Sequence, residues 1–130
     1  MFSSTLKTID KLKKILAKDP QSKIFAALAE AQRESRNLDE AEATAHKGVL
    51  RHPQYAGGFL ALGRVLLDRQ KFKEAVPLLK RATELDSQNL LAHQLLGTAF
   101  IQLKEPKEAL KAFKAVLFLN PASAKARSAV

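Results

Sequence analysis

The first amphipathic stretch of the chain lies over residues 4–18, where apolar side chains recur at three- and four-residue spacing. These side chains are Leu6, Ile9, Leu12 and Leu16. The spacing places them on one face of an α-helix, with Ser4 or Thr5 as N-cap and Asp19-Pro20 as the stop. A second face carries only lysines, which are Lys7, Lys11, Lys14 and Lys18. The pattern predicts a flanking helix within residues 1–21 that has a solvated basic face.

Beyond this helix, the pattern of small and large apolar residues returns at a fixed interval of about 34 residues. Leu28-Ala29 returns as Leu62-Gly63 and as Leu96-Gly97, and Ala41 returns as Ala75 and Ala109. The interval divides the chain into three units, 22–55, 56–89 and 90–123, followed by the start of a further helix in 124–130.

Each unit contains two helical segments. In the first unit Ser22 is positioned to cap a helix over about 23–35, and Asn37 to cap the next helix with Glu40 three residues later, as in a capping box. Two helices joined by so short a turn must lie antiparallel. The small residues named above are the positions where we expect the two helices to approach closely, because a branched side chain would hold them apart.

A helix–turn–helix unit of this length and pattern resembles the tetratricopeptide (TPR) repeat. The sequence departs from the family where a tryptophan is most frequent, at Phe25, Phe59 and His93, and where an aromatic residue usually follows the small one, at Gln32, Leu66 and Phe100. The first unit also has Ala45 and Gly48 where the others carry Leu79/Phe113 and Ala82/Val116. The resemblance implies an all-α, right-handed solenoid of three units with an N-terminal flanking helix and a truncated C-terminal helix.

In the TPR family the first helix of each unit lines a concave groove. Carried over by matching positions, the partner-binding residues are Ala26, Glu30, Arg33, Leu60, Arg64, Leu67, Leu91, Gln94 and Ile101, with Lys23, Glu34, Gly57, Asp68, Thr98 and Gln102 beside them. Such a groove suits an amphipathic helix or an extended segment with apolar anchors and a few acidic residues. Two alternatives stay open: the leucines complete the seams between units, or the helix at 4–18, from the same or another copy, fills the groove.

Some TPR grooves hold the acidic C-terminal tail of a heat-shock chaperone through a carboxylate clamp of Lys, Asn and Arg. The matching positions here are Ala26, Glu30, Ala61, Leu91 and Leu95. None of these side chains is a suitable donor, so we predict that the groove works without such a clamp.

Composition limits the class of protein. The chain has 130 residues, a net charge of +9, 46% hydrophobic residues and no cysteine, which fits a folded protein without disulfides or thiolate chemistry. The sequence has no signal-peptide pattern and no apolar run of about 18 residues, so a membrane location is not expected. We expect a cytoplasmic protein.

The basic surplus supports an alternative function. Lys7, Lys11, Lys14 and Lys18, together with Lys104, Lys107, Lys111 and Lys114, could bind nucleic acid or another anionic partner. The chain lacks the interleaved aromatic residues that stacking on single strands requires, which disfavours nucleic acid.

No catalytic pattern is present in the sequence. His46, His52 and His93 have no acidic or cysteine partners at metal-ligand spacing, and we expect His93 to be packed between helices. Gly57-Gly58 is not followed by the lysine of a phosphate-binding loop. We therefore expect no catalytic residue, metal or cofactor, and predict a protein–protein interaction scaffold or adaptor.

The last full unit ends with apolar residues that a further unit would cover, namely Val116, Leu117, Phe118 and Leu119. This pattern suggests a fragment of a longer protein, a homo-oligomer joined through its ends, or a self-assembling structural segment. Within the second unit, Pro77 is expected to bend the helix that begins near Phe72.

Overall fold

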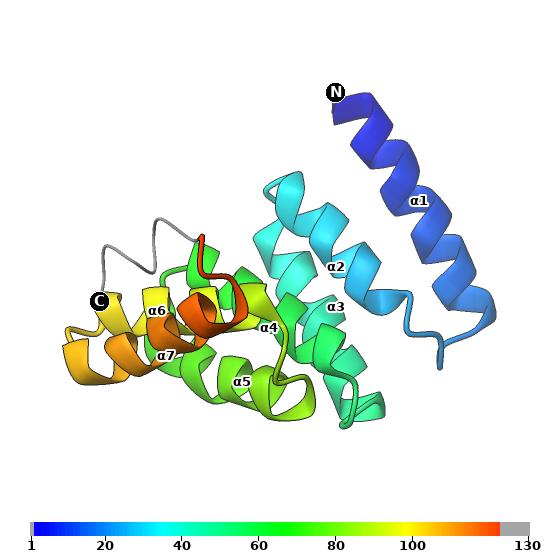
Figure 1. The fold of residues 1–130 in the computed structure, drawn as a ribbon. Coiled ribbons are helices and arrows are strands. Elements are labelled where there is room, and N and C mark those ends of the chain that lie inside the picture. The colour runs from blue at the N-terminus through cyan, green and yellow to red at the C-terminus, as the bar shows by residue number, and fades with distance from the viewer. Residues whose placement is uncertain (1, 123–130) are drawn as a thin grey trace.

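The structure is a computed structural model that describes residues 2–122, with side chains from Thr5 onward, and in this range it contains seven helices and no strand. They are α1 (Phe2–Lys18), α2 (Phe25–Glu34), α3 (Leu38–Arg51), α4 (Ala56–Asp68), α5 (Phe72–Leu85), α6 (Leu90–Gln102) and α7 (Pro106–Leu119). The helices stack in chain order into a solenoid (Figure 1). The expected all-α solenoid is confirmed, and the helix start predicted in 124–130 lies outside the described residues.

The three helix pairs α2–α3, α4–α5 and α6–α7 are closed by turns that share one backbone geometry. Arg36, Gln70 and Lys104 occupy the same place in each turn and all have φ near +60°, at 66°, 61° and 60°. The residue that follows each of them donates a backbone hydrogen bond into the preceding helix, for example from Asn37 N to the Gln32 carbonyl at 2.9 Å. This is the Schellman type of helix ending, built here without glycine.

The helix caps differ in part from the prediction. Ser22 Oγ accepts a hydrogen bond from the Ile24 N–H at 3.1 Å, and the helix proper begins at Phe25. The side chain of Asn37 makes no capping hydrogen bond, so the expected capping box does not form. Asn89 does cap its helix, because its Oδ1 accepts from the Ala92 N–H at 3.0 Å.

The core forms where the two helices of a pair meet. A Cβ on Gly63 would lie 2.5 Å from Leu79 Cδ2, and a Cβ on Gly97 would lie 2.7 Å from Phe113 Cζ. The glycines are therefore needed because a large side chain of the second helix covers each of them. The sequence predicted that the two backbones approach closely at these positions, whereas in the structure the close contact is between a glycine and a side chain. Leu79 and Phe113 are fully buried as a result.

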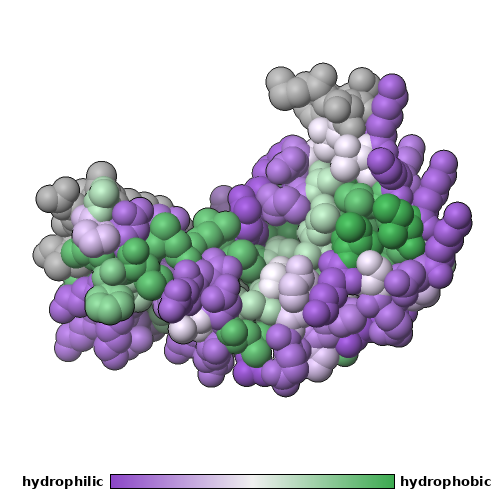
Figure 2. Space-filling model, turned by 45° about the vertical axis from the view of Figure 1, so that its right-hand side comes forward, coloured by the Kyte–Doolittle hydropathy of each residue, from purple (hydrophilic) through white to green (hydrophobic). Residues whose placement is uncertain are grey.

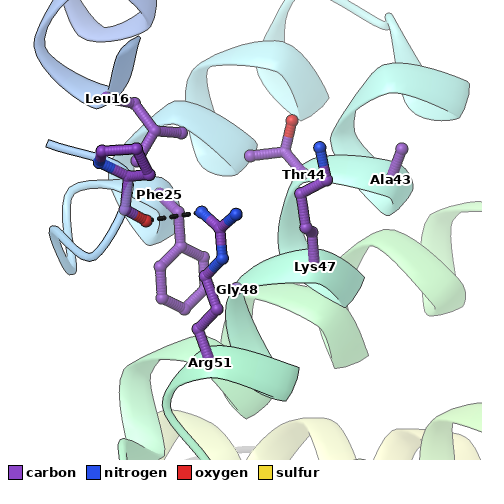
Figure 3. Close-up of a pocket in the computed structure, with 8 residues that line it drawn as sticks. Leu16, Phe25, Ala43, Thr44, Lys47, Gly48 and Arg51 are labelled. Atoms are coloured by element: carbon purple, nitrogen blue, oxygen red, sulfur yellow. Dashed lines mark hydrogen bonds between the residues drawn. The ribbon is translucent and has the colours of Figure 1, made fainter. Parts of the chain in front are cut away.

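The first unit buries its helix interface by a different arrangement. Ala29 faces a pair in which Ala45 replaces the large residue, and Phe25 supplies the missing volume. The Phe25 ring covers Gly48, where any Cβ would overlap it (Figure 3). The same ring stacks on the ring of His52, with 5.8 Å between the centroids. The departure of this unit at Gly48 from the repeat pattern is thus a compensation for the buried phenylalanine.

Helix α1 extends the stack at its N-terminal end. Ile9, Leu12 and Leu16 pack against Leu28 and Ala31 of α2. Lys13 of α1 also forms an exposed ion pair with Glu40 of α3, with 3.5 Å between Nζ and Oε2. Arg51, the last residue of α3, donates a 2.6 Å hydrogen bond to the Pro20 carbonyl in the connection between α1 and α2 (Figure 3). This hydrogen bond ties the connection to α3. In this structure α1 therefore lies beside α2, at the end of the array shown in blue in Figure 1, and does not fill a groove.

Two further expectations concern α5 and α7. Helix α5 continues through Pro77, which is exposed, so the missing N–H does not end the helix. On α7, Val116 is fully buried, which corrects the expectation that it forms exposed end surface, whereas Phe118 is 86% exposed. Across residues 2–122 no helix is both long and apolar enough to span a bilayer.

The first prediction concerns Gly48. We expect Gly48→Ala to lower the free energy of unfolding by about 1–3 kcal/mol, because the added methyl group collides with the Phe25 ring. In a Phe25→Leu background the same change should cost much less or become stabilising, because alanine is the better helix former. Urea unfolding followed by circular dichroism measures both values. Equal effects in the two backgrounds would show that the two residues are not coupled.

The second prediction concerns Gln32, which is 2% exposed and whose Oε1 has no hydrogen-bond partner in the described structure. The other units carry Leu66 and Phe100 at this position. We expect Gln32→Leu to raise the free energy of unfolding by about 1–2 kcal/mol, because it removes a buried acceptor that has no donor. Gln32 Nε2 donates one hydrogen bond, to Glu40 Oε2 at 3.4 Å, which the substitution also removes. Thermal and urea unfolding test the prediction, and a destabilised variant would show that the hydrogen bonds of the amide outweigh the cost of the buried acceptor.

Candidate functional site

The candidate site is the inner groove, which we define as the surface of α2, α4 and α6 that faces the inside of the curved stack. Helix α2 contacts α4 and α4 contacts α6, whereas α3, α5 and α7 do not contact one another in the described range. Neighbouring elements converge on the inside of a curve and diverge on the outside, so the first helices line the inner side. Figure 2 shows the surface hollowed between the end with α1 and the end with α6 and α7.

Charged side chains cross the groove between α2 and α4. Arg33 pairs with Glu30 on its own helix and with Asp68 on α4, where Nη1 lies 3.0 Å from Oδ2. Arg64 of α4 forms an ion pair with Glu30 of α2 at 3.3 Å, and Arg36 forms an ion pair with Asp68 at 3.3 Å. We call these five residues the arginine–carboxylate network.

Arg33 is the centre of the arginine–carboxylate network, since its side chain is only 16% exposed. Hydrogen bonds to Glu30, and then to Asp68, raise the pKa of Arg33 well above its ordinary value against the opposing effect of burial. The sequence predicted Arg33 and Arg64 as donors for acidic partner residues. The structure instead places both beside carboxylates of the chain itself, so a large part of their charge is already compensated within the chain.

The ion pairs between units all join the first unit to the second within the described residues. On the opposite side of the stack, Arg69 contacts Asp39 at 2.8 Å and Glu42 at 3.2 Å, and Lys71 contacts Glu42 at 3.2 Å. The second and third units meet through apolar side chains and through Lys80, whose Nζ lies 5.6 Å from the centroid of the Phe100 ring. The two junctions of the array therefore rest on different interactions.

A pocket of about 290 Å³ opens in the inner groove between the three first helices. Its apolar lining comes from Leu67, Leu95 and Phe72, and its polar lining from Arg33, Arg64, Asp68, Thr98 and Gln102. Sequence reasoning missed Phe72 and identified Leu95 only as a clamp position. Phe72 begins α5, a second helix, and nothing in the repeat pattern places it at the groove.

The predicted apolar anchors have different surroundings. Leu60 and Leu67 are partly buried and pack against the main core, as does Ala26, which supports the alternative that they complete seams between units. Leu91 is partly exposed and belongs to neither core cluster. Ile101 is 50% exposed and lines a different cavity with Pro106, Ala109, Leu110 and Phe113, so it lies toward α7 and away from the pocket.

Helix α6 contributes polar side chains at four-residue spacing, which are Gln94, Thr98 and Gln102. This spacing places them along one face of the helix. The Thr98 hydroxyl donates to the Gln94 carbonyl at 3.0 Å, and the exposed amide of Gln102 lies at the pocket. Amide groups both donate and accept, so this face can hydrogen-bond the backbone of a bound segment.

The histidines and lysines do not form a competing site. His52 and His93 place Nε2 at 2.7 Å and 2.9 Å from the carbonyls of Gln21 and Ser87, and no group of three metal-ligand side chains occurs within residues 2–122. His93 is partly exposed, and its ring is hydrogen-bonded to the chain itself. The two lysine sets lie on α1 and around α7, at opposite ends of the stack (Figure 1), so they do not form one continuous basic track.

The chain resembles known proteins in sequence and in fold. A 36% identical match over 85 residues is found in the human protein O-mannosyl-transferase TMTC3, covering 65% of this chain but only 9% of that protein. Among solved structures, MamA superposes with a TM-score of 0.88 at 20% identity, over 98% of this chain and 70% of its own. YrrB, described as a TPR protein with an unusual peptide-binding site, superposes with a TM-score of 0.83 at 22% identity, over 91% of this chain and 61% of its own.

The family is shown by the sequence itself. The tetratricopeptide repeat model matches residues 26–89 and again 60–124, which together include α3 to α7 and nearly all of α2. The matches agree with three helix pairs that share the same turn, two of which also share the same contact between a glycine of the first helix and a large side chain of the second. The chain therefore belongs to the tetratricopeptide repeat family.

Proposed function

We propose that this protein is a non-catalytic scaffold that binds a segment of a partner protein in the inner groove. The observation that carries the proposal is the pocket between α2, α4 and α6, which combines apolar walls with hydrogen-bonding side chains on α6. The solved structure of YrrB is described as having a peptide-binding site, which supports peptide recognition as a use of this fold.

The chemistry of the groove indicates what kind of segment fits. Because the arginine–carboxylate network is internally paired, a partner gains little from acidic side chains near α2. The apolar lining and the amides of α6 instead favour an extended segment or a helix that inserts one or two apolar side chains. Burial of one or two such side chains contributes about 1.5–6 kcal/mol before the cost of association. These contacts alone therefore support only weak binding, with a Kd well above about 10 μM.

The predicted absence of a carboxylate clamp is part of the same proposal. Glu30 occupies one clamp position, and its carboxylate is held by Arg33 and Arg64. An acidic C-terminus approaching this position would meet a carboxylate, and displacement of Glu30 would leave a partly buried charge without its partners.

The groove can be tested without disturbing the core. Leu60 and Leu67 are poor targets because they pack against the core, whereas Leu91 and Gln102 do not. We expect Leu91→Ser combined with Gln102→Ala to weaken partner binding by about tenfold, through the loss of one apolar contact and one amide. Affinity capture from native lysate, quantified against wild type, measures the change.

The control for this experiment makes the same two substitutions elsewhere. Leu6→Ser combined with Gln88→Ala changes exposed residues away from the groove and should leave capture unchanged. Circular dichroism should be the same for all three proteins. The proposal is wrong if the groove variant retains the same partners in the same amounts as wild type.

The clamp prediction has its own measurement. We expect an acidic peptide ending in a free carboxylate to bind no better than its C-terminally amidated form, within about twofold by calorimetry. The physical reason is the absence of unpaired donors at the clamp positions. Low micromolar binding that disappears on amidation would contradict this.

A further inference from the structure

A second apolar surface lies on the outer side of the stack, where the inner groove does not reach. It is the outer cleft, which we define as the space between α3 and α5 above the exposed side of α4. Phe59, Leu62 and Leu66 form its floor, and Val49, Leu50 and Leu78 are the apolar residues of its walls. Its volume of about 460 Å³ exceeds that of the inner pocket, at about 290 Å³.

The outer cleft is open because of the residues at its edge. Leu50 is 71% exposed, although it is a large apolar side chain at the lip of the cleft. His46 on the same wall is also exposed. An apolar cavity with an exposed leucine at its lip is a surface that burial by a partner would stabilise.

At the matching place one unit later, a charged side chain of the chain itself lies over an aromatic ring. There Lys80 stands at the position of His46, and its ammonium lies 5.6 Å from the centroid of the Phe100 ring, which replaces Leu66. The lysine stem thus lies over the floor of that space, and Glu84 stands at the position of Leu50. The second junction shows within this molecule which kind of side chain covers such a floor.

The charges around the outer cleft favour the same kind of side chain. Two carboxylates line it, Glu42 on α3 and Glu74 on α5. Glu42 is held by Arg69 and Lys71, whereas Glu74 is exposed and makes no ion pair with any described residue. The unit-three counterpart of Glu74 is Glu108, which pairs with Lys111 at 3.3 Å. Glu74 is therefore an unpaired acidic group beside an apolar cavity, on a chain whose net charge is +9.

We propose that the outer cleft binds a basic amphipathic helix of a protein partner. One lysine or arginine of the helix lies over Leu66 as Lys80 lies over Phe100, with its charged end at Glu74, and the apolar stripe of the helix covers Leu50 and Phe59. The recognition is apolar at the floor and electrostatic at the lip, which is the mode by which amphipathic helices bind in grooves. This surface is separate from the inner groove, so it goes beyond the function proposed above.

The probe is a fluorescein-labelled synthetic helix of about 15 residues with leucines at i, i+3, i+4 and i+7 and lysines elsewhere, compared with a matched peptide in which glutamates replace the lysines. Fluorescence anisotropy with the full chain should show that the lysine peptide binds with a Kd on the order of 10–100 μM. The apolar floor is insensitive to salt, and the contact with Glu74 is a single exposed ion pair, so added salt should weaken the binding by less than about tenfold. Absence of binding, or loss of binding with modest salt, would overturn the proposal.

Three variants locate the binding. His46→Lys introduces the side chain that closes the second junction, and it should weaken the lysine peptide by at least about tenfold. Glu74→Gln should weaken it by about three- to tenfold, and Leu50→Gln by a similar factor. The matched control, Glu108→Gln, removes the same charge at the equivalent place and should change the affinity by less than about twofold.

The outcomes separate this proposal from the one on the inner groove. Equal losses of affinity in Glu74→Gln and Glu108→Gln would mean that the peptide responds only to the overall charge of the chain. An unchanged affinity in His46→Lys would mean that the peptide binds elsewhere. Either result overturns the proposal that the outer cleft binds the peptide. The Leu91→Ser, Gln102→Ala variant should bind the lysine peptide as wild type does. If it alone loses the peptide, the basic helix belongs to the inner groove and the outer cleft is not its site.

Discussion

The packing of a small residue of one helix of each pair beneath a large side chain of the other is the contact on which the rest of the structure depends. Leu79 reaches full burial only because Gly63 has no Cβ, and Phe113 does so over Gly97. The contact holds the pair at a fixed separation, which in turn positions the outer faces of the pair for the neighbouring units. In the first unit, Phe25 and Gly48 reach the same result with large and small exchanged between the helices.

The stacking of these pairs creates two surfaces of different character. On the inner side the first helices converge, and the arginine–carboxylate network and the α6 amides meet around a small pocket. On the outer side the second helices diverge, and the side chain at one position decides whether the gap is filled. Lys80 lies over Phe100 at one junction, whereas at the other the cleft beside His46 is open. Surface chemistry therefore varies between units while the repeated core contact stays the same.

The sequence was sufficient for the fold because the interval between small residues is visible without coordinates. It predicted the helix pairs, the turns and the inner position of residues such as Arg33 and Leu67. It did not predict the partners of Arg33, since Asp68 lies a whole unit away and the pairing depends on how closely α2 approaches α4. The outer cleft was missed for a similar reason, because it exists only where α3 and α5 fail to touch, and no local pattern encodes that gap.

The unequal distribution of ion pairs along the stack has a mechanical consequence. The first junction is held by directional charge pairs on both of its sides, whereas the second is held by apolar packing and one lysine over an aromatic ring. Salt weakens the first kind of contact far more than the second. We therefore expect ionic strength to change the angle between the first and second units. The angle between the second and third units should depend much less on salt.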